Sequence, residues 1–202
     1  PGIPKGNAEE SAKSRFSVLT ARVTKSARTS NKLRWKKVKG AQGYIILGNK
    51  CNKSGKKYKY KVLKVIGKKN ATSYTHKKLK KGTYYKYIVQ AYKMVKGKPK
   101  ILATSKTVHA ATTGGKYATI KSLKLNKSKV TLKKGKKFTI KSREVKKGKI
   151  LKRHRKIAYE TSNAKVASVS KKGVVKAKKK GTCFIYVYAQ NGAYKKLKVR
   201  VK

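Results

Sequence analysis

The chain has 202 residues, a formal net charge of +56 and a hydrophobic content of 38%. This length favours two ordinary domains over one large one. No apolar run approaches the roughly 18 residues that a transmembrane helix needs, and no signal peptide opens the chain. Because the sequence starts at Pro1 and not at methionine, we expect it to be part of a longer protein, with any anchor or export signal outside it.

The charge is carried almost entirely by lysine. There are 60 Lys and Arg residues against four acids, Glu9, Glu10, Glu144 and Glu160, and only eight of the basic residues are arginine. Lysine is a compact, hydrated charge that favours diffuse attraction over bidentate recognition. Such a chain repels itself, so we expect its compact state to gain stability from salt or from a bound polyanion. The hydrophobic content and the regular alternation of Val, Ile and Tyr argue against disorder.

The first half of the chain shows the pattern of short strands. Residues 1–14 lack hydrophobic periodicity and contain two prolines, which predicts a linker or a flexible N-terminal segment. Residues 15–112 hold seven short apolar or alternating runs at the spacing of a β-sandwich. The runs are FSVLTARV, KLRWKKV, GAQGYIILGN, KKYKYKVLKVI, SYTH, GTYYKYIVQAYKMV and SKTVHAAT. A turn is predicted at residues 96–99, before the last run.

Three groups of residues in this half resemble a fibronectin type III domain. They are Leu33-x-Trp35 for the second-strand tryptophan, Gly40-Ala41-x-Gly43-Tyr44 for the turn into the third strand, and Leu79-x-x-Gly82-Thr83-x-Tyr85 for the tyrosine corner. The resemblance covers about residues 16–112 and implies that Tyr85, Tyr87, Val89 and Ala91 face the core. The family often has proline where Lys81 stands. These positions imply a fold and no activity.

The second half is separated by a glycine pair. TTGGK predicts a hinge at residues 113–116 and a second domain at 117–202. Between Tyr159 and Val201, turns ending in glycine divide β-branched runs into five short strands. Asn191-Gly192 lies between two alternating runs, which predicts a hairpin turn with positive φ at both residues.

The motifs YETSN, KVASVS, KKGVVKAKKKGT and KLKVRV, in this order, resemble a group 2 bacterial immunoglobulin-like (invasin/intimin-like) domain. KSLKLNKSKVTLKKGKKFTIKS would supply its first strands, so the resemblance covers about residues 117–202. Lysine fills turns in which the family often has Asp or Glu. The expected fold class is therefore all-β, with two tandem immunoglobulin-like β-sandwich domains. The resemblance implies an extracellular protein, at the bacterial cell surface or secreted, and says little about a ligand.

Residues suited to catalysis or metal binding are scarce. His76, His109 and His154 lie far apart in the sequence, and no aspartate exists to orient them. Glu9 and Glu10 are adjacent in the N-terminal segment and cannot flank a substrate as paired carboxylates do. Clustered Cys and His ligands, or several carboxylates, are absent. We therefore expect no enzymatic activity, no cofactor and no metal site.

The cysteines and one glutamate allow further expectations. Cys51 and Cys183 fall in different predicted domains, so no bridge is expected; Cys51 lies in a polar loop as a candidate free thiol, and Cys183 has the phase of a buried small hydrophobe. Immunoglobulin-like surface domains of Gram-positive bacteria can form internal Lys–Asn isopeptide bonds beside an acid. Glu160 with Asn126 or Asn163 would suit such a bond, whereas the alternative is that Glu160 pairs with surface lysines.

Two groups of residues are candidates for binding a polyanion. The densest basic cluster is predicted in a loop at residues 144–156, with the candidates Lys146, Lys147, Lys149, Lys152, Arg153, His154, Arg155 and Lys156. The second group is an outward aromatic strip on one strand, Phe184, Tyr186 and Tyr188, which could offer a stacking surface beside phosphates or sulfates. Lysines occur throughout both halves, so a solvated cationic coat is the alternative to a defined site.

The expected function is a non-enzymatic cell-surface spacer or adhesion module of an exported bacterial protein. Diffuse lysine-driven attraction would draw it to anionic polymers, namely cell-wall polymers and sulfated glycans, with nucleic acid also chemically compatible. One alternative is a dedicated nucleic-acid-binding protein, against which the scarcity of arginine argues. The other is an accessory region of a larger secreted enzyme. We expect this segment to be a monomer with no membrane insertion.

Overall fold

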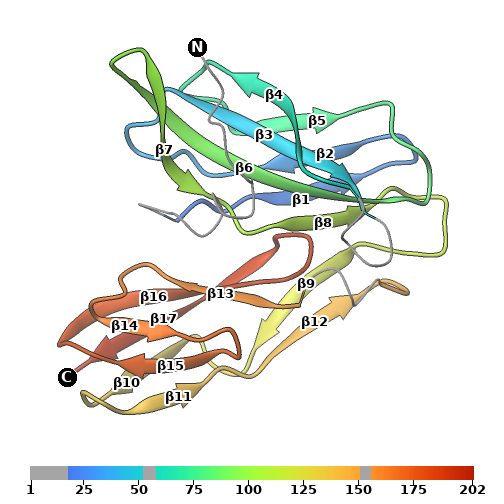
Figure 1. The fold of residues 1–202 in the computed structure, drawn as a ribbon. Helices are drawn as coiled ribbons and strands as arrows, with labels where there is room; N and C mark the ends of the chain where they lie inside the picture. The colour runs from blue at the N-terminus through green and yellow to red at the C-terminus, as the bar shows by residue number, and fades with distance from the viewer. Residues whose placement is uncertain (1–17, 52–57, 151–155) are drawn as a thin grey trace.

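The computed structural model describes residues 18–51, 58–150 and 156–202, and within these ranges the chain is built from strands without any helix (Figure 1). The first half contains β1 (Arg22–Ser26), β2 (Asn31–Arg34), β3 (Gly43–Lys50), β4 (Lys61–Ile66), β5 (Ser73–His76), β6 (Tyr84–Val95), β7 (Lys98–Thr104) and β8 (Val108–Ala111). The second half contains β9 (Ile120–Leu125), β10 (Lys129–Leu132), β11 (Lys137–Thr139), β12 (Ser142–Lys146), β13 (Ala158–Thr161), β14 (Ala167–Val169), β15 (Val174–Ala177), β16 (Gly181–Tyr188) and β17 (Tyr194–Val201).

In the first half, two antiparallel sheets face each other. One has the strand order β1-β2-β5; the other has the order β4-β3-β6-β7, and β8 also pairs with β6. The sequence predicted a single strand after the turn at residues 96–99, but the structure has two. Lys96 and Gly97 both have positive φ (47° and 73°), which closes a tight hairpin and lets β7 begin at Lys98. Pro99 is tolerated in β7 because edge strands and strand starts accept proline.

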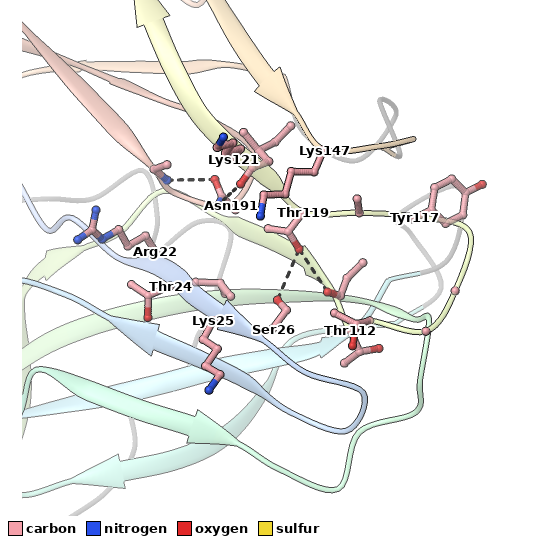
Figure 2. Close-up of a pocket in the computed structure, with 18 residues that line it drawn as sticks. Arg22, Thr24, Lys25, Ser26, Thr112, Tyr117, Thr119, Lys121, Lys147 and Asn191 are labelled. Carbon is pink, nitrogen blue, oxygen red and sulfur yellow. Dashed lines mark hydrogen bonds between the residues drawn. The ribbon is translucent and has the colours of Figure 1, made fainter.

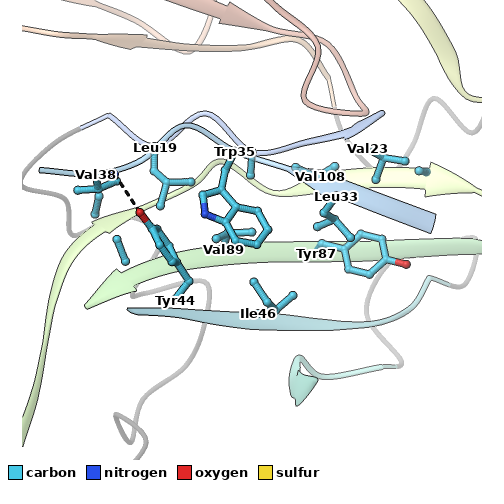
Figure 3. Packing of buried hydrophobic residues seen from close by; sticks show 14 of the residues in the cluster. Leu19, Val23, Leu33, Trp35, Val38, Tyr44, Ile46, Tyr87, Val89 and Val108 are labelled. Carbon is cyan, nitrogen blue, oxygen red and sulfur yellow. Dashed lines mark hydrogen bonds between the residues drawn. The ribbon is translucent and has the colours of Figure 1, made fainter. Parts of the chain in front are cut away.

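Aromatic rings fill much of the space between these sheets (Figure 3). The Trp35 and Tyr44 ring centroids lie 5.3 Å apart, and the Tyr44 hydroxyl accepts a hydrogen bond from the Val38 amide at 3.0 Å. The Tyr85 hydroxyl accepts one from the Lys80 amide at 2.9 Å, which is the expected tyrosine corner. Tyr85, Tyr87, Val89 and Ala91 all belong to this core, so their predicted inward direction is confirmed.

The second half is also divided into sheets, with the orders β10-β17-β16-β13, β11-β15-β14 and β12-β9. The five strands predicted between Tyr159 and Val201 are present as β13 to β17. Their inward side chains form an aliphatic core in which Ile185, Leu197 and Val199 are fully buried. Cys183 is 2% exposed and packs in this core as the small hydrophobe that its strand phase predicted.

The turn between β16 and β17 differs from the prediction. Gly192 has a φ of +83°, but Asn191 is not among the described residues with positive φ. The Ala189 amide donates to the Ala193 carbonyl and the Gly192 amide donates to the Ala189 carbonyl, so the loop is longer than a two-residue turn. Asn191 also accepts a hydrogen bond from the first half through its carbonyl, as described below.

The two halves have separate cores that share no residue. The expected fold class, all-β with two tandem sandwiches, is therefore confirmed. The domain limits drawn from the sequence, including the hinge at residues 113–116, stay predictions, and the predicted N-terminal segment at 1–14 lies outside the described residues. Among the described residues there is no helix capable of crossing a membrane.

Candidate anion-binding surface

The predicted basic cluster is only partly covered by the structure. Lys146 ends β12 opposite Ile120, and Lys147, Lys149 and Lys156 are exposed. Lys152, Arg153, His154 and Arg155 lie outside the described residues. The segment predicted as one loop from residue 144 begins inside a strand, because Glu144 and Lys146 pair with β9. The role of the cluster as a binding site stays a prediction.

The aromatic strip is on the face of β16 that points away from the core. Phe184 and Tyr186 are partly exposed, but Tyr188 is 1% exposed. The register of the β16–β17 pair places Lys198 beside Phe184 and Lys196 beside Tyr186. Alternate side chains of a strand share one face, so these rings and lysines point to the same side of the sheet.

Cations flank the rings on this side of the sheet. Lys196 Nζ lies 4.9 Å from the centroid of the Phe184 ring, within the range of a cation–π contact. Parallel pairing of β10 with β17 adds Lys129 beside Lys198. Same-face residues along a strand are about 7 Å apart, so the charges form evenly spaced rows. We call this surface the aromatic–cationic face; it consists of Lys129, Phe184, Tyr186, Tyr194, Lys196, Lys198 and Arg200.

Tyr188 cannot act as the open ring that the sequence predicted. Its hydroxyl donates a hydrogen bond of 2.5 Å to Glu160 Oε1, and its ring lies 5.8 Å from the Tyr194 ring. Glu160 is itself only 5% exposed, so the hydrogen bond provides a partner for a buried carboxyl oxygen. The strip available to a ligand therefore consists of Phe184 and Tyr186, extended by Tyr194 and not by Tyr188.

The hypothesis of an isopeptide bond gains no support from the positions of the two asparagines. Asn126 Oδ1 accepts a hydrogen bond from the Lys141 amide, and Asn163 Oδ1 accepts one from the Lys165 amide. Both asparagines are exposed, whereas Glu160 is buried. Each side-chain oxygen thus stabilises an exposed loop.

The histidines and Cys51 lie within packed structure. His76 packs edge-on against Tyr85 and Tyr87, its Nδ1 lies 3.1 Å from the Tyr87 hydroxyl, and burial lowers its pKa. His109 is buried on β8, and His154 lies outside the described residues. Cys51 is a buried free thiol, not a loop residue open to solvent, and burial raises its pKa to about 11. Among the residues that the structure covers, no three potential metal ligands are grouped together.

The loop between β16 and β17 joins the two sandwiches. The Asn191 carbonyl accepts a hydrogen bond from the Val23 amide at 2.9 Å, and the Gln190 carbonyl accepts one from the His109 amide at 2.8 Å. The Tyr84 hydroxyl lies 3.2 Å from Gln190 Oε1, to which it donates. These bonds attach the tip of a second-half hairpin to β1, β6 and β8 of the first half. We call residues 190–192 the interdomain joint.

The joint is closely packed and supported by an acid. A Cβ atom added to Gly192 would lie 2.1 Å from the Ala21 carbonyl oxygen, so only glycine fits there. Glu144 Oε1 accepts a hydrogen bond from the Gln190 amide at 2.8 Å. Glu144 and Glu160, the two acids within the described residues, thus both bind residues at or next to the hairpin tip. The sequence predicted only a turn here. The contacts between the halves are made by backbone groups, which every residue type carries, so no sequence pattern indicates them.

One side of the joint is hollowed into a cavity of about 680 Å³. Figure 2 shows Arg22, Lys25, Lys121 and Lys147 around it, together with hydroxyl-bearing side chains. The Thr119 hydroxyl donates to the Ala111 carbonyl at 3.2 Å, and Asn191 Nδ2 donates to the Ile120 carbonyl at 2.9 Å. Both polar groups therefore already have hydrogen-bond partners, and the Thr119 bond joins the two halves.

Two β-sandwiches with separate cores, a tyrosine corner in the first and a parallel terminal strand pair in the second, define an immunoglobulin-like all-β protein. The second sandwich matches a family model: residues 119–199 match the bacterial Ig-like domain (group 2). Domains of this group occur in bacterial surface or exported proteins. The predicted resemblance of this half is thereby confirmed.

Two solved structures are similar to half of the chain. One is the solution structure of the fibronectin type-III domain of human fibronectin type III domain containing protein 3, with 24% identity, a TM-score of 0.38, and coverage of 50% of this chain and 88% of that chain. Another, titled "Myokine structure", has 17% identity, a TM-score of 0.40, and coverage of 50% of this chain and 100% of that chain. A search of curated proteins found no match.

Proposed function

We propose that the chain is a non-enzymatic spacer and adhesion module of an exported bacterial protein, and that its lysines attract anionic polymers of the cell wall or sulfated glycans. The occurrence of group 2 bacterial Ig-like domains in surface or exported proteins supports the location. Immunoglobulin-like and fibronectin type III-like domains are typically non-catalytic, which supports a binding or spacing role.

The observation that carries the proposal is the aromatic–cationic face. Its rings are suited to pack against sugar rings, and Lys196, Lys198 and Arg200 recur on alternate residues of β17, beside those rings. A repeating anionic polymer can contact several of these charges at once, so its attraction adds up along the strand. The interdomain joint supports the spacer role, because hydrogen bonds between the sandwiches limit their relative rotation.

Binding of three soluble polymers would test the proposal: heparin, a glycerol-phosphate wall polymer and duplex DNA, each at physiological and at high salt. We expect micromolar or tighter binding to the first two at physiological salt and a steep loss at high salt, because exposed charges are screened. The double variant K196Q/K198Q should bind several-fold more weakly than K64Q/K68Q, which removes two exposed lysines from the first sandwich. No binding of either anionic polymer would refute the proposal, and selective, saturable binding of DNA would favour the nucleic-acid alternative.

A further inference from the structure

A second hollow lies between the sandwiches, next to Tyr194. It has a volume of about 350 Å³, and its lining includes Thr20, Arg22, Arg34, Lys36, Lys37 and Tyr194. The first five come from β1, β2 and their flanking residues in the first sandwich, whereas Tyr194 comes from β17 in the second. The volume is within the range of small-ligand pockets, about 300–1,000 Å³.

The lining is strongly cationic. Arg22 and Arg34 lie opposite each other in the pairing of β1 with β2, and Lys36 and Lys37 follow directly along the chain. Among the described residues that line the pocket there is no acid. Four like charges around one hollow repel one another, and an anion bound between them would remove that repulsion.

Thr20 provides an independent indication of a ligand. Thr20 lines the pocket, whereas its neighbours Leu19 and Ala21 belong to the first core, and Thr20 is 6% exposed. Its Oγ1 is buried and has no hydrogen-bond partner. A buried hydroxyl without a partner destabilises a fold, and such groups are rare in native proteins. A ligand oxygen in the pocket would accept the hydrogen bond that Thr20 can donate. In the larger cavity of Figure 2, by contrast, Thr119 and Asn191 already have partners.

Tyr194 connects the pocket to the aromatic–cationic face. Its ring centroid lies 5.7 Å from that of Tyr186, and Tyr186 neighbours Lys196 across the strand pair. A ligand whose one unit fills the pocket could therefore continue over Tyr194 and Tyr186 along the lysines of β17. Flat aromatic surfaces of this kind pack well against the C–H face of a sugar ring.

We propose that the pocket binds one anionic sugar unit of a polysaccharide, with its sulfate, phosphate or carboxylate between Arg22, Arg34 and the Thr20 hydroxyl, and its ring against Tyr194. The inference deepens the proposed function and rests on it, since it assigns a defined site to an attraction that could otherwise be spread over the whole surface. The chain of the polysaccharide leaves the pocket over Tyr186 and beside Lys196.

The test uses the full chain and a heparin-derived hexasaccharide, with uncharged maltohexaose as the comparison ligand and isothermal titration calorimetry as the measurement. We expect T20V and R34Q each to raise Kd about tenfold, the usual effect of losing a hydrogen bond to a charged group. The matched controls T139V and R143Q alter exposed residues of the same types in the second sandwich and should change Kd less than twofold. T20V should melt no lower than the wild type, because valine replaces a buried hydroxyl that has no partner.

The outcomes separate the two proposals. If the wild type binds long heparin but not the hexasaccharide, or if T20V and R34Q bind like their controls, the pocket is refuted and the diffuse attraction remains. If the wild type binds neither heparin nor the wall polymer, both proposals fail. Equal affinity for maltohexaose would refute the anionic chemistry of the pocket. Loss of hexasaccharide binding in T20V and R34Q alone, with unchanged melting, would establish the site.

Discussion

The two sandwiches are stabilised in different ways. The first core contains Trp35, Tyr44, Tyr85 and Tyr87, and the hydroxyls of Tyr44 and Tyr85 accept hydrogen bonds from loop amides. Within the described residues, the buried core of the second contains Ile, Leu, Val, Ala and Cys183, and the buried ring of Tyr188 lies on the opposite face of β16. Large rings with polar tips can fix both a core and the loops beside it, whereas an aliphatic core depends on β-branched packing and on turn geometry. The difference predicts which substitutions destabilise each half most.

The largest effect is expected from W35A. Removing a buried tryptophan should lower the free energy of unfolding of the first sandwich by about 3–5 kcal/mol, because a cavity replaces the ring. Differential scanning calorimetry would show the loss in the transition of the first sandwich, and F184A, at a partly exposed ring, serves as the control. An equal shift of the whole heat-capacity profile would instead show that the two halves unfold as one cooperative unit.

The joint is tested by G192A. Both Gly192 and Gly135 have a φ of +83°, but a Cβ at Gly135 meets nothing within 4 Å, whereas at Gly192 it meets the Ala21 carbonyl. We expect G192A to cost about 1–3 kcal/mol more than G135A, because it adds a steric clash to the same backbone strain. Small-angle scattering should also show a larger radius of gyration for G192A only. Equal behaviour of the two variants would show that the joint does not hold the halves together.

The tyrosine corner gives a smaller effect. Y85F removes the acceptor of the Lys80 amide, which should lower stability by about 1–2 kcal/mol in chemical denaturation. Y186F, on the partly exposed face of the second sandwich, should change stability by less than about 0.5 kcal/mol. If Y186F lowered stability as much as Y85F, the hydrogen bond between the Tyr85 hydroxyl and the Lys80 amide would not be a stabilising feature particular to the first sandwich.

The smallest effect concerns Cys51. Burial raises its pKa from 9.0 to about 11, so the neutral thiol is favoured in the folded state. Its contribution to stability is complete below about pH 9 and is lost as the pH rises from 9 to 11. Alkylation by iodoacetamide at pH 8.5 should therefore be much slower in the folded protein than in denaturant. Rapid alkylation of the folded protein would contradict the buried position, and C51A should remove this pH dependence.

Much of the fold could be predicted because its signals are local. The resemblance to a fibronectin type III domain placed Val89 and Ala91 in the first core, strand phase placed Cys183 in the second, and glycine-ended turns separated β13 to β17. Errors arose where the chain departs from simple turns. β7 was missed because Pro99 was assigned to the turn before it, and Asn191 lacks the positive φ that an Asn-Gly pair suggested.

The candidate site was predicted less completely. The phase of β16 correctly separated Phe184 and Tyr186 from the core, since period-two alternation depends only on neighbouring residues. The burial of Tyr188 and the addition of Tyr194 depend on which strands pair and on what covers them. The larger part of the predicted basic cluster, from Lys152 to Arg155, lies outside the described residues and stays a prediction.

The sequence alone determined that this protein is built from two cationic β-sandwiches, because strand periodicity, turn glycines and charge are properties of adjacent residues. Only the tertiary structure decided how the sandwiches meet. The main-chain bonds of Gln190 and Asn191, the fit of Gly192 against Ala21, and the pocket around Thr20 bring together groups that are more than 80 residues apart. Backbone hydrogen bonds and cavities have no signature in residue type, so they become visible only when the chain is folded.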